Sequence, residues 1–137
     1  MKISRLEDMA LLLMTELGEN YSTRRVSLSH IAKKHHLSYL FLKKIARALR
    51  LSGLVSGKVG MDGGYCLPRA PRTISVWDIV EACSGKPHVE SLNDLVSECP
   101  VNTNCLPQKI RRTIGSTFEQ SMRNVRLSDL MRKGAQT

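Results

Sequence analysis

The first half of the chain shows a helical repeat of apolar positions, interrupted twice by polar turns. Residues 6–17 carry apolar side chains at intervals of three and four, which predicts one amphipathic helix. Ser27 and Ser38 each precede a further apolar repeat, and serine is a favoured N-cap because its hydroxyl accepts a hydrogen bond from a free backbone N–H. We therefore predict two more helices, one ending near residues 35–36 and one reaching about Leu51. In the last of these helices a single stripe is expected to be buried: Leu42, Ile45, Ala46 and Leu49.

A β-hairpin is predicted to follow these helices. Two short β-rich runs, residues 54–59 and 64–67, flank the glycine-rich sequence GMDGG at residues 60–64. Two helices joined by about three residues, the second of them cationic, form a helix-turn-helix, and a hairpin directly after the second helix is a wing. The glycines permit a tight turn and let the backbone approach a phosphate. Their spacing does not match a nucleotide-binding loop.

Two more helices are predicted in the second half. Ser75 is the expected N-cap of a helix over residues 75–83, and Asp78 is placed to complete a capping box. A long helix is expected over residues 108–122, and it carries an apolar stripe at every fourth position: Ile110, Ile114, Phe118 and Met122. No later helix of similar size is predicted that would cover this stripe. We expect a second copy of the chain to cover it, and packing against the chain's own first helix is the alternative.

Charge is distributed unevenly along the chain, whose formal net charge is +9. Residues 22–72 hold eleven lysines and arginines against one acid, Asp62, whereas residues 73–100 hold five acids against one base, Lys86. A basic half beside an acidic stretch is typical of a protein that binds a polyanion, and nucleic acid is the expected one. A solvated basic face is the alternative.

The expected fold class is mainly α with a small β-hairpin wing, as a winged helix-turn-helix plus a long C-terminal dimerisation helix. Three segments are predicted: a DNA-binding winged helix-turn-helix domain at 1–72, a connecting helix with a cysteine loop at 73–105, and a dimerisation helix with a tail at 106–137. The N-terminal apolar run ALLLM is short and follows two acids, so neither a signal peptide nor a membrane span is predicted. We expect a cytoplasmic protein.

Four cysteines stand at positions 66, 83, 99 and 105. In the cytosol they are expected to be reduced, which favours metal, redox or core roles over structural disulfides. Cys66 and Cys83 are expected to pack against apolar neighbours. Cys99 and Cys105 enclose five residues in ECPVNTNC, and two such thiols suit either an iron–sulfur cluster or a reversible disulfide. No nucleophile–base pair or carboxylate dyad has a suggestive spacing, so an enzyme is not expected.

The order of these elements resembles the IscR/NsrR/RirA/CymR family of bacterial winged-helix transcription regulators. The resemblance covers nearly the whole chain and is most specific in LRLSGLVSGKVGMDGGYCL (49–67) and in the cysteine loop, with ISVWDIVEA (74–82) and LSDLM (127–131) in the expected order. It implies a homodimer that binds palindromic promoter DNA, with the long C-terminal helices crossing at the interface. Many members hold an iron–sulfur cluster near that interface, and its state tunes their affinity for DNA. Others, of the CymR type, carry no cluster and respond through a protein partner.

The resemblance also implies a set of cluster ligands. Cluster-binding members use three cysteines before the long helix; Cys99 and Cys105 match the last two, and the first has no counterpart here. Some members add an acidic side chain near residue 8 of the partner subunit, where this chain has Glu7 and Asp8, with Asp8 the better match. Cys83 is a further candidate if the chain folds back. This set favours a 2Fe–2S over a 4Fe–4S cluster.

The start of the recognition helix, from residue 39, is expected to enter the major groove of DNA. Lys43 is suited to guanine or phosphate, and Tyr39 to a thymine methyl group or a phosphate. Lys58 is expected near the DNA backbone or minor groove, but IscR has an arginine where this chain has Val59, which weakens minor-groove reading. The predicted DNA-binding residues are Ser38, Tyr39, Phe41, Lys43, Lys44 and Arg47 in the recognition helix, Lys58, Gly60, Gly63 and Gly64 in the wing, and Arg24, Arg25 and Lys33 as phosphate-positioning residues.

Overall fold

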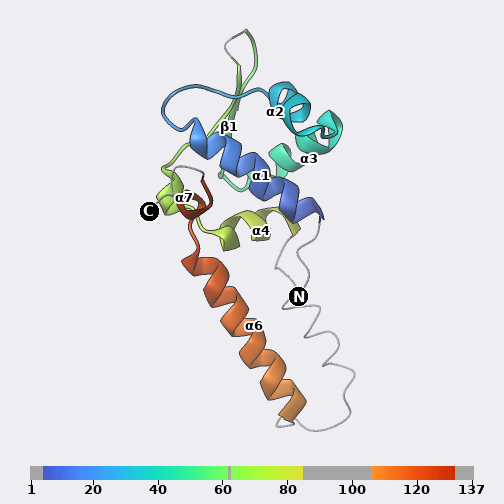
Figure 1. The fold of residues 1–137 in the computed structure, drawn as a ribbon, viewed down its shortest axis with the longest axis vertical. Coiled ribbons are helices and arrows are strands. Elements are labelled where there is room, and N and C mark those ends of the chain that lie inside the picture. Colours follow the sequence, from blue (N-terminus) through green and yellow to red (C-terminus); the bar gives the residue numbers. More distant parts are fainter. Residues whose placement is uncertain (1–4, 62, 85–105, 132–137) are drawn as a thin grey trace.

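The helices of residues 5–51 form what we call the body of the protein. A hairpin lies at one end of it, and a long helix extends from the other (Figure 1). The computed structural model describes residues 5–61, 63–84 and 106–131. With the labels of Figure 1, the elements are α1 (Arg5–Glu19), α2 (Leu28–His35), α3 (Tyr39–Leu51), β1 (Ser56–Lys58), β2 (Gly64–Cys66), the 3-10 helix η1 (Pro71–Thr73), α4 (Val76–Ser84), α6 (Leu106–Asn124) and α7 (Leu127–Leu130). The predicted fold class, mainly helical with one hairpin, is confirmed.

The helix-turn-helix forms because both of its helices are capped by serine. The backbone N–H of His30 donates to Oγ of Ser27 at 3.2 Å, and that of Phe41 donates to Oγ of Ser38 at 3.4 Å. Each cap satisfies one of the N–H groups that a helix start leaves without a partner. α2 ends where His36 adopts a left-handed φ of 53°, which stops the helix and turns the chain into α3.

The core is built around α1, which packs against both α3 and α4. The four residues predicted as the buried stripe of α3 are all at most 1% exposed. α1 meets them with its own stripe of fully buried side chains: Ala10, Leu13, Met14 and Leu17. Truncation of one of these, such as Leu13→Ala, is expected to cost about 2–5 kcal/mol of stability because a cavity is left behind. Ile74, Ile79 and Leu127 join the same core, so it extends beyond the wing into the second half of the chain.

The wing is a two-stranded antiparallel hairpin in which Gly57 pairs with Tyr65. A further bridge ties it to the body, since the N–H of Val26 donates to the carbonyl of Tyr65 at 2.9 Å and the N–H of Tyr65 donates back at 2.8 Å. The strands are shorter than the predicted runs. The hairpin is therefore anchored at its base to the segment just before α2.

α4 connects this body to the long helix. Its predicted capping box is present: the N–H of Asp78 donates to Oγ of Ser75 at 3.1 Å, and the N–H of Ser75 donates to the Asp78 carboxylate at 3.0 Å. On one side Ile79 enters the main core, and on another Trp77 packs in a second cluster with Met122 of α6. α4 therefore contacts both the main core and α6.

α6 is tied to the start of α4 by backbone hydrogen bonds. The N–H of Val76 donates to the carbonyl of Val125 at 2.9 Å, and the N–H of Leu127 donates to the carbonyl of Ile74 at 2.8 Å. Beyond this junction the rest of α6 points away from the body (Figure 1). None of the helices in the described ranges combines the length and the apolar character needed to cross a membrane.

Candidate nucleic-acid interface and sensor residues

The outer face of α3 is basic. Opposite its buried stripe, the exposed side chains include four cations: Lys43, Lys44, Arg47 and Arg50. Tyr39 is also exposed, and Ser38 presents its hydroxyl at the N-terminus of the helix. Phe41, predicted as an exposed DNA contact, is instead half-buried and packed against the core. Phe41 lies at the edge of the apolar stripe, where removing its ring from water stabilises the fold.

A groove of about 390 Å³ runs between this face of α3 and the wing. It is lined from three elements: Ser27, Leu28 and Ser29 at the start of α2, Tyr39, Lys43 and Arg50 on α3, and Gly57, Lys58, Val59, Gly64 and Tyr65 in the wing. Four of the predicted DNA contacts thus share one concave surface: Tyr39, Lys43, Lys58 and Gly64. The two α2 serines and Arg50 were not predicted as contacts. The sequence signal for the two serines was their place at the start of a helix, where hydroxyl groups and free backbone N–H groups can contact a phosphate.

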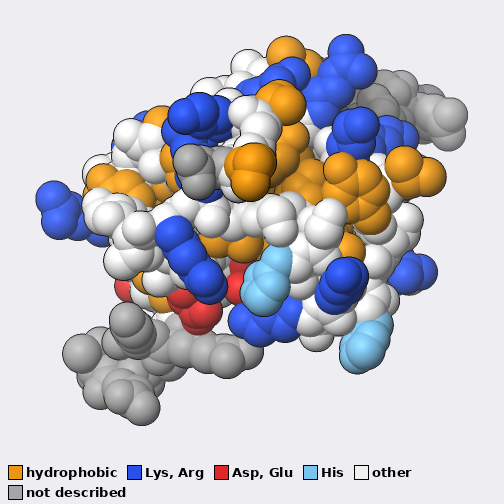
Figure 2. Space-filling view, turned by 90° about the horizontal axis from the view of Figure 1, so that it is seen from above, with side chains coloured by type: hydrophobic (Ala, Val, Ile, Leu, Met, Phe, Trp, Pro, Cys, Tyr) orange, Lys and Arg blue, Asp and Glu red, His pale blue; other side chains and the backbone are white. Residues whose placement is uncertain are grey.

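The same surface is seen end-on in Figure 2. Lys and Arg side chains surround a band of hydrophobic side chains on this face, and among the residues that the structure describes, Asp and Glu are visible near one side. A cationic surface of this kind attracts phosphates, and the groove gives it a definite shape.

Two of the wing glycines have conformations that favour glycine. Gly64 has a φ of +128°, and a Cβ atom there would lie 2.8 Å from the carbonyl oxygen of Val26. Gly60 has a φ of +120°, but no atom lies within 4 Å of its Cβ position. Gly64 is therefore needed for the contact between wing and body, whereas Gly60 only turns the chain.

The residues predicted to position phosphates are dispersed around the base of the wing. Arg24 is exposed, and its Nε donates to Oδ1 of Asn20 at 3.0 Å. Lys33 is exposed on α2. Arg25 is half-buried, and its Nη1 is buried without a hydrogen-bond partner in the described part of the chain. Arg24 and Lys33 are accessible to DNA, and Arg25 only in part.

A buried carboxylate on α1 connects this helix to the end of α2, the first helix of the helix-turn-helix. Glu16 of α1 is 6% exposed and accepts hydrogen bonds from Nζ of Lys34 at 2.9 and 3.2 Å. Nε2 of His35 lies 2.7 Å from the same carboxylate. Burial acts to raise the pKa of Glu16, but the hydrogen bonds and charges of Lys34 and His35 outweigh it, so this pKa lies below 4.5. The end of α2 is thereby fixed to α1.

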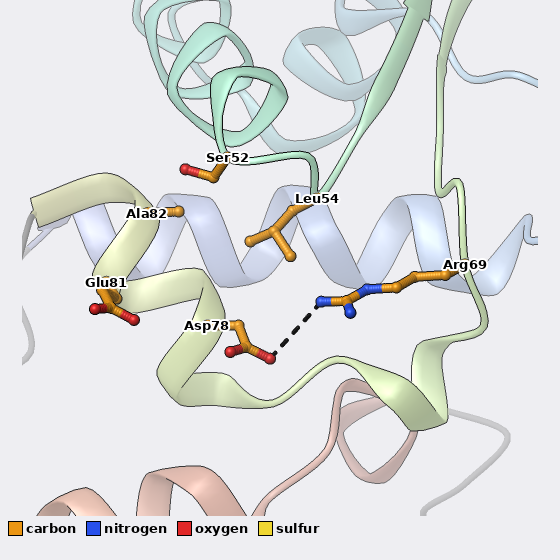
Figure 3. A pocket seen from close by; sticks show the side chains of 6 residues that line it. All are labelled: Ser52, Leu54, Arg69, Asp78, Glu81 and Ala82. Carbon is orange, nitrogen blue, oxygen red and sulfur yellow. Dashed lines mark ion pairs between the residues drawn. The ribbon is translucent and has the colours of Figure 1, made fainter.

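A second, smaller hollow of about 220 Å³ lies where α3 meets α4 (Figure 3). Arg69, in the segment after the wing, reaches toward Asp78 of α4, and Nη2 lies 3.9 Å from Oδ2. Glu81 lines the same hollow from the next turn of α4. Both members of the ion pair are partly exposed, so it adds little stability.

The predicted cluster ligands fall into three groups. Cys99 and Cys105 lie outside the described residues. Asp8 is exposed on α1, where a partner molecule can reach it. Glu7 is 1% exposed and lies near Cys83, whose pKa is raised to about 11 by burial and, to a smaller extent, by the negative charge of Glu7. Within the described ranges no three His, Cys, Asp or Glu side chains form a group that could hold a metal ion.

Comparison with known proteins gives a consistent assignment. The profile of the Rrf2 family, described as an iron-dependent transcriptional regulator, matches residues 3–133. The protein rrf2 of Nitratidesulfovibrio vulgaris is 27% identical over 120 residues, which span 88% of this chain and 80% of that protein. The structure of CymR (YrzC), the global cysteine regulator of B. subtilis, has a TM-score of 0.78 at 27% identity, covering 100% of this chain and 98% of that one. IscR of T. potens gives a TM-score of 0.78 at 25% identity, with coverages of 100% and 92%.

These findings confirm the resemblance drawn from the sequence, and they agree with the winged helix-turn-helix seen in the structure. The family and these relatives are regulators of transcription, not enzymes. Since the family profile spans nearly the whole chain, the protein belongs to the Rrf2 family of transcriptional regulators.

Proposed function

We propose that the protein is a cytoplasmic homodimer that binds promoter DNA through α3 and the wing and represses transcription. The observation that carries this proposal is the groove in which Lys43 and Arg50 of α3 face Lys58 of the wing. A recognition helix of this kind enters the major groove, while the wing follows the flanking backbone. Lys43 and Tyr39 are the proposed base-contacting residues. Lys44, Arg47, Arg24 and Lys33 are proposed to contact phosphates.

The DNA-binding proposal is tested by selecting duplexes from a randomised library and comparing two neighbouring lysine variants. Lys43 lines the groove, whereas Lys44 is exposed but does not line it. Lys43→Ala is expected to weaken binding to the selected duplex by about 1–3 kcal/mol and to leave binding to random DNA much less affected. Lys44→Ala is expected to weaken both similarly, with a shallower salt dependence. An equal loss on both duplexes for Lys43→Ala would exclude base reading by this lysine.

For the signal, we propose that an iron–sulfur cluster near the dimer interface tunes the affinity for DNA. Cys99, Cys105 and Asp8 of the other subunit are the proposed ligands, because thiolates are the usual ligands of such clusters and Asp8 is an exposed oxygen donor. The cluster would supply redox chemistry and a covalent link between the loop and the partner subunit. Cys83 does not suit a ligand role, because it is partly buried against the core of its own subunit and is not offered to a partner. Glu7 is buried in its own subunit and is not offered to a partner.

A cluster-free regulator is the second candidate. It is supported by the count of donors: without Cys83 and Glu7, one chain offers two thiols and one carboxylate, fewer thiols than the three that cluster-binding relatives use. In this version a reversible Cys99–Cys105 disulfide, or a protein partner, would control the affinity for DNA. The likeness to the global cysteine regulator CymR is compatible with it.

One preparation separates the two candidates. The protein is purified without oxygen, and iron, sulfide and absorbance are measured for the wild type and for Cys99→Ala with Cys105→Ala. A coloured wild type and a colourless variant are expected for the cluster. Asp8→Asn is then expected to lower the cluster content, and Cys83→Ala serves as the control that leaves it unchanged. A colourless wild type that takes up no cluster on reconstitution would favour the cluster-free regulator. This result would not contradict the proposed DNA binding.

A further inference from the structure

The tip of the wing presents two apolar side chains that have no protein surface to cover. Val59 is 98% exposed and Met61 is 105% exposed, the highest values for large apolar side chains in the described residues. In the part of the chain that the structure describes, nothing lies within 4 Å of the Cβ position of Gly60 between them, so this side of the turn is open. Exposed apolar side chains are common, but two that protrude fully from a narrow tip mark a contact site.

The base of the hairpin is fixed to the rest of the protein, and Val59 lies beside cations. Below it, Gly57 pairs with Tyr65, and Tyr65 is bonded in turn to Val26 of the body. Val59 lines the groove that also contains Lys43 and Lys58. Any molecule that fills this groove and follows Lys58 outward therefore reaches Val59 and then Met61. The cations of the groove suit a partner that carries negative charge along its edges. The apolar tip suits a surface between those edges on which uncharged side chains can lie.

We propose that Val59 and Met61 form an apolar contact with the floor of the DNA minor groove, beside the major-groove site of α3. This inference rests on the proposed DNA binding. Two phosphate backbones border the minor groove, which suits Lys58 at the entrance, and apolar side chains are frequent wedges in that groove. The cations that line the adjoining groove, Lys43, Arg50 and Lys58, favour DNA over an apolar protein surface, and two side chains make too small a patch for a stable protein interface.

The contact has a defined preference among base pairs. In the minor groove, A·T pairs present only acceptors, whereas G·C pairs add the N2 amino group of guanine. An apolar tip cannot accept a hydrogen bond from that amino group, and burying the group without a partner is unfavourable. The wing is thus expected to reject G·C because of the amino group, and not to read any base by hydrogen bonding. An arginine at this position would act differently, through its charge.

The experiment uses inosine, which lacks the N2 amino group. In the duplex selected by the wild type, each base pair of the flanks is replaced in turn by I·C or G·C. At the pairs under the wing, the wild type is expected to bind I·C as well as A·T and to bind G·C about fivefold more weakly or worse. Val59→Ser with Met61→Ser is expected to bind the best duplex several-fold more weakly and to lose the preference for I·C over G·C. Leu51→Ser, which removes a 75% exposed apolar side chain outside the groove, is the matched control.

The outcomes separate the inference from the DNA-binding proposal. If the wild type selects no duplex, DNA binding itself fails and the wing contact falls with it. If the wild type selects a duplex but shows no flank position where I·C and G·C differ, the minor-groove contact is wrong. It is equally wrong if the double serine variant keeps that difference. Thermal unfolding of the two variants is expected to match the wild type, because all three substituted side chains are exposed.

Discussion

Nε2 of His35, at the end of α2, lies 2.7 Å from the buried carboxylate of Glu16 in α1. The two residues are nineteen positions apart, and their contact fixes the first helix of the helix-turn-helix to the body. Lys34 shares the same carboxylate. Because the acceptor is buried, this contact holds α2 more firmly than an exposed ion pair would.

Glu16→Gln is expected to lower the free energy of unfolding at pH 7 by about 1 kcal/mol. The amide keeps the shape of the carboxylate and one acceptor oxygen, but it removes the charge that pairs with Lys34. The loss is modest because Lys34 is partly exposed and its charge is screened by solvent. Urea denaturation measures the change. Glu81→Gln, at an exposed position on α4, is the control, and its free energy of unfolding is expected to change little. Equal effects of the two variants would show that Glu16 does not stabilise the contact between α1 and α2.

The same carboxylate predicts how stability depends on pH. The pKa of Glu16 in the folded protein is lowered from 4.5, so the unfolded chain binds its proton more readily. The contribution of Glu16 is complete above about pH 4.5 and is lost as the pH falls through the lowered pKa. Unfolding measured from pH 7 down to pH 3 should therefore show a smaller acid-induced loss for Glu16→Gln than for the wild type. Parallel curves would show that this group does not contribute.

Gly64→Ala and Gly60→Ala are expected to differ although both glycines have a positive φ. Both substitutions carry the cost of that conformation, but only at Gly64 would the new methyl group collide with the backbone of Val26. Gly64→Ala should destabilise the protein by about 1 kcal/mol or more beyond Gly60→Ala. It should also weaken DNA binding, because the wing would separate from the body. Urea denaturation and binding to the selected duplex measure both effects, and equal losses for the two variants would show that the contact with Val26 is unimportant.

Arg123 lies over the ring of Trp77, with 4.8 Å from its guanidinium carbon to the ring centroid. Arg123→Met is expected to cost about 0.5–1 kcal/mol of stability and to shift the fluorescence of Trp77, the only tryptophan. Glu119→Gln is the matched control. It removes the 2.9 Å ion pair with Arg123 but leaves the cation near the ring. A fluorescence shift of equal size in the control would assign the effect to the ion pair and not to the contact with Trp77.

Local signals account for most of what the sequence predicted correctly. Ser27, Ser38 and Ser75 are caps that act within three residues, so their helices could be located without knowledge of the fold. The pairing of Glu16 with His35 could not be predicted, because it depends on how α1 and α2 pack. Its only sequence signal was a charged residue within the apolar repeat of α1. Long-range contacts of this kind follow from the fold and not from a local pattern.

The candidate site was predictable in part for the same reason. Lys43 and Lys58 were identified from charge and from their places in two motifs, but the groove between them required the position of the wing relative to α3. Phe41 was misjudged because a residue at the edge of an apolar stripe packs or protrudes according to its neighbours. Glu7 and Cys83 were named separately as ligands, and only the packing of α1 against α4 shows that they neighbour each other in one subunit.

The outer face of α6 predicts the oligomeric state. Ile110 is 48% exposed and Ile114 is 46% exposed, one turn apart on the part of α6 that points away from the body. Met122, two turns further along the same stripe, is buried against α4. The stripe therefore continues from the protein's own core onto a surface that a second copy can cover, as in a helix pair with a shared apolar seam.

Ile110→Glu with Ile114→Glu is expected to convert the dimer to a monomer at micromolar concentration, because two buried charges would face each other across a two-fold axis. Ser116→Glu with Gln120→Glu is the matched control, since both residues are exposed on the other side of α6 and add the same charge at the same spacing. Sedimentation velocity measures the mass of each variant. The monomer should also lose its advantage for a palindrome over a single half-site, because only a dimer places two recognition helices on one duplex. If the control dissociates as readily as the isoleucine variant, added charge and not the loss of this face would explain the result, and the dimer interface would have to lie elsewhere.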